Sequence, residues 1–128
     1  MAGTIVADTI QDGAGNSTAM DNAIYGSAKA WVNFNGVTTT TIRASYNVSS
    51  ITRNGAGDYT VNFTNAFADA NYAATFGARN DGAGSGANFS LVVKQSSTPT
   101  ASAINIVCGP PSTGTTSDSA YIYASFFR

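Results

Sequence analysis

The chain offers few side chains of the kinds that enzymes use for catalysis. Its 128 residues contain no histidine, and all seven acidic residues are aspartates. General acid–base catalysis at neutral pH most often uses histidine, a Ser-His-Asp triad requires it, and glycosidases use a pair of carboxylates. Most of the aspartates lie in predicted turns, where hydrogen bonds to the local backbone explain them: Asp8, Asp12, Asp21, Asp58, Asp69, Asp81 and Asp118. We therefore expect no catalytic residues and a non-enzymatic protein.

Metal and cofactor sites are also poorly supported by the sequence. A zinc site would need histidine or several cysteines, and Cys108 is the only cysteine. Residues 12–16 and 80–82 offer oxygen ligands for calcium, but neither segment has the alternating acidic spacing of an EF-hand. We interpret both as turns and expect no metal and no cofactor, leaving open a calcium ion in these loops. Cys108 itself ends an apolar run and is expected to be a small buried side chain.

The composition argues against two classes of partner. Charged residues make up 10% of the chain, against roughly 25% in typical soluble domains, and the six basic residues are scattered. A nucleic-acid-binding surface needs clustered lysine and arginine, so we expect no nucleic-acid partner. No apolar run approaches the ~20 residues that span a bilayer, and residues 1–4 do not resemble a signal peptide. We expect that the chain does not insert into a membrane. We also expect it to be made in a cytoplasm.

The first 28 residues differ from the rest of the chain and are expected to form an N-terminal arm. Residues 3–10 favour a short strand, and the glycine-rich residues 12–16 favour a turn. Ser17 or Thr18 could then cap a helix of barely two turns that ends at Gly26, although an irregular segment is an equal alternative.

Residues 29–128 alternate apolar and polar side chains in short runs that are separated by turn residues. Strands are expected near residues 30–36, 38–51, 58–64, 71–79, 89–94, 103–108 and 120–128. In the second run, Ile42, Ala44, Tyr46 and Val48 are expected to share one face. Residues 54–57 predict a tight hairpin turn, and residues 80–86 predict an exposed hairpin tip. The last strand has two apolar faces, which places it centrally in a sheet or at a subunit interface.

These features together predict one all-β domain. Seven or so strands at about 10-residue spacing, joined by glycine-, asparagine- and proline-rich turns, are typical of an antiparallel β-sandwich, here a jelly-roll-like knob behind a short arm. The only tryptophan, Trp31, begins the first firm strand. We expect it to be a packing anchor where the arm meets the sandwich, in preference to the alternative of a sugar-stacking platform, because its neighbours Val32 and Phe34 make both faces of the strand apolar.

Several segments, in order, resemble a module of tailed-bacteriophage virion proteins that commonly forms the C-terminal tip of tail fibres. They are GTIVADTIQDGAGNST (3–18), AKAWVNFNG (28–36), IRASYNVSSI (42–51), NGAGDYTVNF (54–63) and DANY (69–72). The resemblance covers residues 3 to about 79, and the remainder matches only in pattern. It implies a homotrimeric knob on the virion surface, with other virion proteins, capsid or tail, and a host-surface polysaccharide or protein as partners.

The resemblance and the residue pattern together lead to expected roles for individual residues. Thr4, Ile5, Val6 and Ile10 would attach the arm to the particle. Asn54, Arg79, Asn80 and Asp81 would lie in loops that face the host, because binding residues gather on loops held by a rigid scaffold. Tyr121, Tyr123, Phe126 and Phe127 would form the oligomer interface.

Two alternatives to a host-attachment fibre remain at this stage. Fibre proteins usually carry a shaft ahead of such a tip, whereas here the module begins at the first residues, so the arm is expected to bind the particle directly or through another virion protein. A capsid decoration protein that cements the head without contacting the host fits the same features. A polysaccharide-cleaving tip protein is the third possibility, and the lack of histidine and glutamate argues against it.

Overall fold

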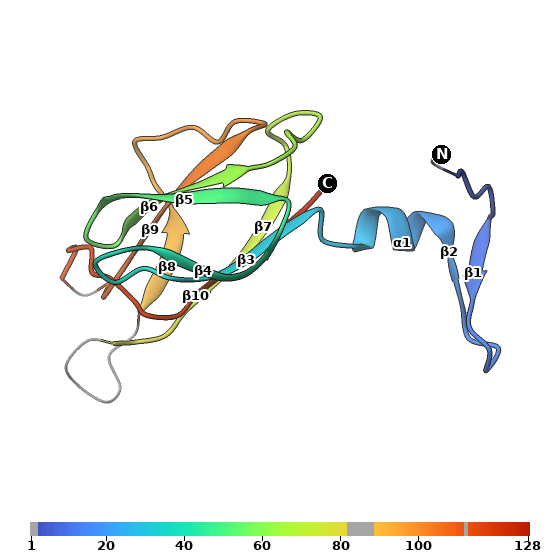
Figure 1. Cartoon of the computed structure of the whole chain (residues 1–128), viewed down its shortest axis with the longest axis horizontal. Coiled ribbons are helices and arrows are strands. Elements are labelled where there is room, and N and C mark those ends of the chain that lie inside the picture. The colour runs from blue at the N-terminus through green and yellow to red at the C-terminus, as the bar shows by residue number, and fades with distance from the viewer. Residues whose placement is uncertain (1–2, 82–88, 112) are drawn as a thin grey trace.

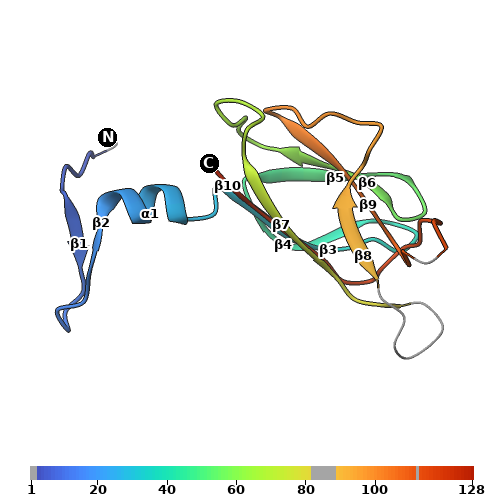
Figure 2. The same cartoon turned by 180° about the vertical axis from the view of Figure 1, so that it is seen from behind.

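The computed structural model describes residues 3–81, 89–111 and 113–128. These residues form a small N-terminal arm followed by a two-layer antiparallel β-sandwich (Figures 1 and 2). The predicted all-β fold is confirmed. No helix among the described residues is long and apolar enough to cross a membrane.

The arm consists of a β-hairpin and one short helix. Strand β1 (Thr9–Gln11) pairs with β2 (Ser17–Ala19), and the carboxylate of Asp12 closes the turn by accepting hydrogen bonds from the backbone N–H groups of Ala14 and Asn16, both at 2.9 Å. The predicted turn at residues 12–16 is therefore confirmed. The predicted leading strand is wrong for residues 3–8, which pair with no strand in the described part of the chain.

Helix α1 (Met20–Gly26) follows directly after β2. The expected capping by Ser17 or Thr18 is wrong, because both residues belong to β2 and Ala19 occupies the N-cap position without a side-chain hydrogen bond. None of the helix residues is buried, so the helix contributes no side chain to the hydrophobic core.

Eight strands build the sandwich as two four-stranded sheets. The first sheet has the order β4 (Thr41–Tyr46), β3 (Ala30–Asn35), β10 (Ile122–Phe127), β7 (Ala73–Ala78). The second has the order β5 (Val48–Gly55), β6 (Asp58–Phe63), β9 (Ala103–Gly109), β8 (Ser90–Val93). The predicted hairpin turn between β5 and β6 is confirmed, and so is the central position of the C-terminal strand β10.

Two predicted connections differ from the structure. Residues 38–51 do not form one strand, because the chain leaves the first sheet at Asn47 and enters the second at Val48. Strands β7 and β8 lie in different sheets, so the connection between them is not a hairpin; most of its predicted tip, residues 82–86, lies outside the described residues.

Asn47 makes the first of these crossings possible. It has a φ of 54°, in the left-handed region that asparagine tolerates better than most residues. Its side chain donates hydrogen bonds to the carbonyls of Lys29 and Asn65, both at 3.1 Å, and accepts one from the Asn65 N–H at 2.8 Å. The corner, the start of the sandwich and the β6–β7 connection are thereby fixed together.

The core lies between the two sheets and is largely aromatic. Phe34, Tyr59 and Phe126 are fully buried, and Phe126 packs edge-on against Phe63 with ring centroids 5.0 Å apart. Phe34 and Tyr59 meet in the same way at 5.3 Å. Such edge-to-face pairs add to the stabilisation that comes from burying the rings.

A bulge in β4 overturns the predicted face of that strand. Phe34 pairs with Ile42 while Asn33 pairs with Ala44, so Arg43 is the extra residue. The bulge reverses the alternation: Ile42 packs on the core, whereas Ala44 and Tyr46 lie on the outer face opposite Asn33 and Trp31. Val48 is buried, but it belongs to the other sheet.

Two expectations about aromatic residues are also wrong. Trp31 does not anchor the core: it lies on the outer face of the first sheet with 40% of its surface exposed. Phe126 cannot lie at an oligomer interface, because it is completely buried inside the sandwich. Its neighbour Tyr123, one of the expected interface residues, is 46% exposed on the outer face, and Phe127 is half-buried.

Candidate functional site: the distal loops

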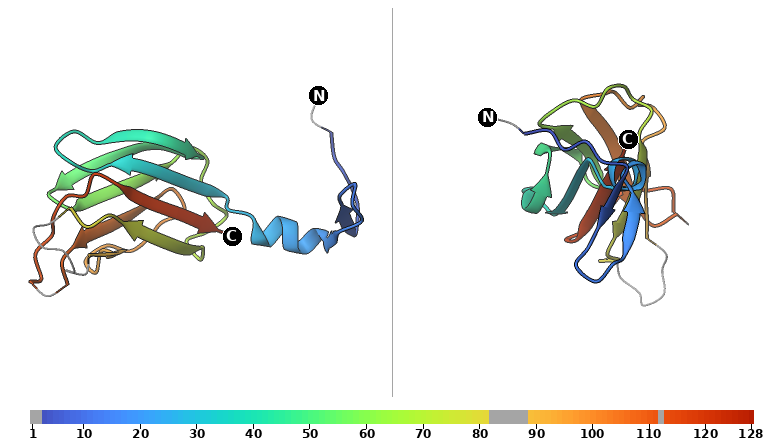
Figure 3. Two further views of the ribbon diagram at one scale, coloured as in Figure 1. Left: turned by 90° about the horizontal axis from the view of Figure 1, so that it is seen from below. Right: turned by 90° about the vertical axis from the view of Figure 1, so that its right-hand side faces the viewer.

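Four connections lie together at the end of the sandwich farthest from the arm. They follow β3, β5, β7 and β9, which all run toward this end. We call their described residues the distal loops: 36–40, 56–57, 79–81, 89, 110–111 and 113–121. The left-hand view of Figure 3 shows this end of the sandwich on the left and the arm on the right, with the C-terminus on the side of the arm. Residues 82–88 and 112 of these connections are not described. The expected host-facing residues Arg79, Asn80 and Asp81 lie in the distal loops, and Asn54 lies beside them at the end of β5.

Asp118 joins two of the distal loops. Its carboxylate accepts hydrogen bonds from the Arg53 guanidinium at 2.6 and 3.3 Å, from the Gly57 N–H at 2.8 Å and from the Tyr59 hydroxyl at 2.6 Å. Arg53 and Asp118 lie 65 residues apart in the sequence. This ion pair therefore holds the long β9–β10 loop against the β5–β6 hairpin.

The electrostatics of this cluster suit a structural role. Burial alone would raise the pKa of Asp118, but the hydrogen bonds from Arg53, Tyr59 and Gly57 outweigh it and lower the pKa to about 2. Burial is also the main reason that the pKa of Tyr59 lies far above its ordinary value, with the Asp118 carboxylate adding to it. A carboxylate held ionised by this many donors is a poor general base at neutral pH. The cluster thus holds the β9–β10 loop in place.

The close approach of the two loops depends on glycine. Gly57 has a φ of +65°, and a side chain there would collide with the backbone of Cys108 and Ser117. A side chain at Gly36 would collide with the hydroxyl end of Tyr59, and the Tyr59 hydroxyl lies 3.1 Å from the Gly36 carbonyl oxygen. The turn residues identified in the sequence are therefore required for packing between loops as well as for the turn itself.

A second carboxylate, Asp81, organises the neighbouring loop. It pairs with Arg79 Nε at 2.5 Å, accepts a hydrogen bond from the Ala120 N–H and lies 3.2 Å from the Ser119 hydroxyl. Burial opposes ionisation, but these contacts together lower the pKa of Asp81. Ser119 is fully buried, and its hydroxyl lies closer, at 2.7 Å, to the Arg79 carbonyl oxygen. Arg79 and Asp81 thus bond to each other and to the β9–β10 loop.

Tyr121 adds a cationic stack to this end of the molecule. The guanidinium carbons of Arg43 and Arg79 lie 4.2 and 4.3 Å from the centre of its ring. Such contacts favour a positive charge over the ring face. Tyr121, expected at an oligomer interface, is half-buried beneath these two arginines.

Asn54 is engaged within its own hairpin. Its side-chain amide lies 3.2 Å from the Asp58 carboxylate and 3.0 Å from the Thr60 hydroxyl. Asp58 in turn pairs with Lys94 at 2.6 Å. The structure therefore groups the expected host-facing residues at one end, but it gives most of their polar atoms internal partners.

The arm presents the opposite kind of surface. Ile5 is 84% exposed, Val6 is 93% exposed and Ile10 is 46% exposed, while Thr4 is also exposed. A groove of about 590 Å³ lies beside them, and its apolar lining includes Ile5, Ala7, Ile10, Met20 and Ile24. The expected attachment residues thus lie together on an apolar surface that the described chain leaves uncovered.

The described residues contain no cluster of three or more metal-ligating side chains. Cys108 is buried as expected, which raises its pKa to about 11, and its thiol donates to the Ser117 carbonyl at 3.0 Å. Sequence reasoning missed Arg43, Arg53, Asp118 and Ser119. No local signal marks the side-chain partners of Asp118, because they are distant in the chain. Ser119 contacts its near neighbour Tyr121, but its contacts with Arg79 and Asp81 are also distant in the chain.

Comparison with known proteins adds no assignment: no protein-family model, no curated protein sequence and no solved structure matches this chain.

Proposed function

We propose that this chain is a non-enzymatic structural protein on the surface of a bacteriophage particle, a short fibre or knob that contributes to attachment to the host surface. The observation that supports it best is the division of the molecule into two different ends. One end is an arm with exposed apolar side chains, and the other is a set of loops that ion pairs and hydrogen bonds join to one another on the sandwich (Figure 1). The sequence resemblance of residues 3–79 supplies the phage context.

The arm is the part suited to binding another virion protein. Ile5 and Val6 are almost fully exposed, and covering such side chains stabilises an assembly by roughly 1.5–3 kcal/mol each. Large exposed apolar side chains that lie together are typical of interaction sites. In this proposal the arm attaches the protein to the particle, and the distal loops then point outward.

A homotrimer is part of the same proposal. Because Phe126 is in the core, the trimer contacts would have to involve the arm and the exposed apolar side chains. Multi-angle light scattering of the full chain at micromolar concentration measures this directly. We expect three times the 13.1 kDa chain mass, and a monomer would contradict the trimer.

The main test is where the protein lies on the particle. Gold-labelled antibodies raised against residues 29–128 would be imaged on purified particles of the phage that encodes the chain. Label at the tail, with loss of adsorption when the gene is deleted, is the expected result. Label on the head, with normal adsorption and particles that lose stability on heating, would instead identify a decoration protein. Absence of label from particles would refute both.

A pair of variants tests the role of the arm. Replacing Ile5 and Val6 together with aspartate should abolish incorporation into particles without changing the melting temperature of the sandwich, because neither residue contacts the core. Val92→Asp is the matched control, since Val92 is 49% exposed on the sandwich and not on the arm. If the arm variant were incorporated into particles to the same extent as the control, the hypothesis that the arm attaches the protein to the particle would be wrong.

A further inference from the structure

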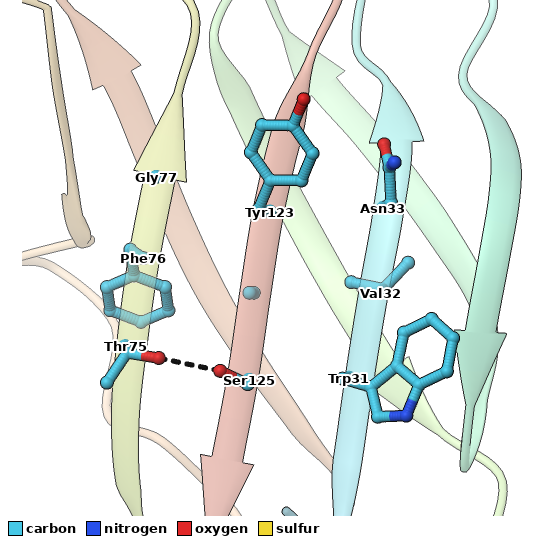
Figure 4. Close-up of a pocket in the computed structure, with 9 residues that line it drawn as sticks. Trp31, Val32, Asn33, Thr75, Phe76, Gly77, Tyr123 and Ser125 are labelled. Atoms are coloured by element: carbon cyan, nitrogen blue, oxygen red, sulfur yellow. Dashed lines mark hydrogen bonds between the residues drawn. The ribbon is translucent and has the colours of Figure 1, made fainter.

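A groove crosses the outer face of the sheet formed by β4, β3, β10 and β7. It has a volume of about 420 Å³, and its outward-facing lining consists of Trp31, Asn33, Thr75, Gly77, Tyr123 and Ser125. Figure 4 views this face directly, with Phe76 behind the strands on the side of the core. The groove lies on the side of the sandwich and is separate from both the arm and the distal loops.

The alternation of the strands explains why these side chains gather here. Trp31 pairs with Ser125 across β3 and β10, and Asn33 pairs with Tyr123 in the same way. Tyr123 then lies opposite Gly77 on β7. Residues paired in this manner project from the same face of a sheet. Trp31 thus has the small Ser125 beside it on β10, and Tyr123 has Gly77 beside it on β7, which leaves open space on these sides of the rings; on its other side Trp31 lies opposite Tyr46 of β4.

Both rings are available to a ligand. Trp31 is 40% exposed and Tyr123 is 46% exposed. In Figure 4, which views the sheet from its outer side, the faces of the Trp31 indole and the Tyr123 phenol ring are turned toward the viewer. An aromatic face presented in this way can stack against the C–H face of a flat ligand ring.

The polar atoms of the groove are only partly used by the protein. Asn33 Oδ1 is buried, yet it has no hydrogen-bond partner among the described residues. An unpaired buried acceptor costs about 1–3 kcal/mol, and a donor from a ligand relieves this cost when the Asn33 amide turns toward the groove. The hydroxyls of Thr75 and Ser125 lie 2.6 Å apart, and one hydroxyl proton of this pair remains for a further acceptor.

None of the described residues that line the groove carries a charge. The site thus combines two aromatic faces, an unsatisfied acceptor and a hydroxyl pair, without any charge. An anionic or cationic ligand would find no counter-charge there. A neutral sugar has apolar C–H faces and several hydroxyl donors and acceptors, and so matches each of these features.

We propose that this groove binds a neutral oligosaccharide. One sugar ring stacks on Trp31 and an adjacent ring stacks on Tyr123, while a sugar hydroxyl donates a hydrogen bond to Asn33 Oδ1. The proposal does not depend on the virion role, because it rests on the geometry of the sheet face. It assigns recognition to the side of the sandwich instead of to the distal loops.

Binding can be measured on the full chain in solution. Trp31 is the only tryptophan, so its fluorescence reports directly on the groove. The probes are short oligosaccharides of glucose, galactose, mannose and N-acetylglucosamine, each titrated separately. We expect a saturable change in Trp31 emission with at least one of them. No change with any of the four would overturn the proposal.

Variants then test the assigned contacts by calorimetric titration with the saccharide that binds. Trp31→Ala and Tyr123→Ala should each weaken binding by about tenfold, the usual scale for losing one aromatic stacking contact. Tyr25→Ala is the matched control, because Tyr25 is 66% exposed on the arm, and its affinity should equal that of the wild type. Equal affinities for all three variants would overturn the proposal.

Asn33→Ala separates ligand binding from a structural role. It removes an acceptor that has no partner within the described protein, so the free energy of unfolding should not fall, whereas saccharide affinity should fall several-fold. Loss of stability with unchanged affinity would contradict the assignment. Light scattering of Trp31→Ala supplies a further check: a smaller oligomer than the wild type would show that a second copy of the chain covers the groove, and the saccharide proposal would then be wrong.

Discussion

Replacing Asp118 with asparagine should destabilise the sandwich because this carboxylate joins two of the distal loops. Its side chain is only 18% exposed, and it faces Arg53, the Gly57 N–H and the Tyr59 hydroxyl. The pKa of Asp118 falls from its ordinary 3.8 to about 2 in the folded protein. At about 1.4 kcal/mol per pH unit, this difference corresponds to about 2 kcal/mol of stability at neutral pH.

The pH dependence of the effect follows from the direction of the shift. A carboxylate whose pKa is lower in the folded state stabilises the protein above its unfolded pKa, and this stabilisation is lost as pH falls through the folded pKa. Asp118→Asn should therefore be less stable than the wild type by about 2 kcal/mol at pH 7. The gap between the two proteins should narrow between about pH 4 and pH 2.

Urea unfolding, followed through Trp31 fluorescence at a series of pH values, measures this gap. The comparison with the wild type cancels the titration of the other aspartates, which both proteins share. Asp21→Asn is the matched control: Asp21 lies in the first turn of α1 outside the core, and its replacement should change stability by less than about 0.5 kcal/mol. A variant as stable as the wild type at pH 7, or a gap that stays constant down to pH 2, would refute the role given to Asp118.

Three further predictions concern other residues that fix the loops and the core. Gly57→Ala should lower the free energy of unfolding by at least about 2 kcal/mol, because its φ is +65° and a Cβ would meet backbone atoms; Gly13→Ala, with open space around it, should change little in the same urea experiment. Asn47→Ala should cost more stability than Asn47→Gly, since alanine loses both the left-handed conformation and three hydrogen bonds whereas glycine loses only the hydrogen bonds; equal losses would contradict this reading of the corner. The Cys108 thiol, buried and with a pKa raised to about 11, should react with a thiol reagent at pH 8 only after urea unfolding, and rapid labelling of the native protein would show that the β9–β10 loop opens readily.

The sequence predicted two features of the sandwich for which a local signal was decisive. The glycine-rich residues 54–57 predicted the β5–β6 hairpin, and the two apolar faces of the last strand predicted the central position of β10. Both features depend on a few neighbouring residues. The crossing from one sheet to the other at Asn47 has no comparable signal. The alternation of apolar and polar residues continues through it, and only Asn47 itself has a left-handed backbone conformation.

The face of a strand was harder to predict when a bulge interrupts it. Arg43 shifts the register of β4 by one residue, so a face read from the alternation is correct before the bulge and reversed after it. A bulge forms because of how two strands pair, and this cannot be read from the bulged strand alone. The interactions of Asp118 were unpredictable for a related reason, because its partners come from residues 53–59.

Trp31 shows that a usable signal was present in the sequence but was outweighed by another. The apolar neighbours Val32 and Phe34 made both faces of the strand look apolar, and this predicted a packing anchor. Yet Trp31 shares its face of β3 with Asn33 and Asn35, whereas Ala30, Val32 and Phe34 share the other face and are buried. The polar neighbours on the same face were the better guide to its direction.

The distribution of unused polar atoms now distinguishes the possible binding surfaces. In the distal loops, the carboxylate oxygens of Asp118 and Asp81 accept hydrogen bonds from Arg53, Arg79 and backbone N–H groups. A ligand there would compete with the bonds that hold the loops in place. In the groove of the first sheet, Asn33 Oδ1 has no such partner among the described residues, and the two rings beside it remain partly in solvent. A ligand gains most where it replaces water without breaking internal hydrogen bonds. Recognition should therefore depend more on Trp31 and Tyr123 than on the loops that the sequence alone favoured.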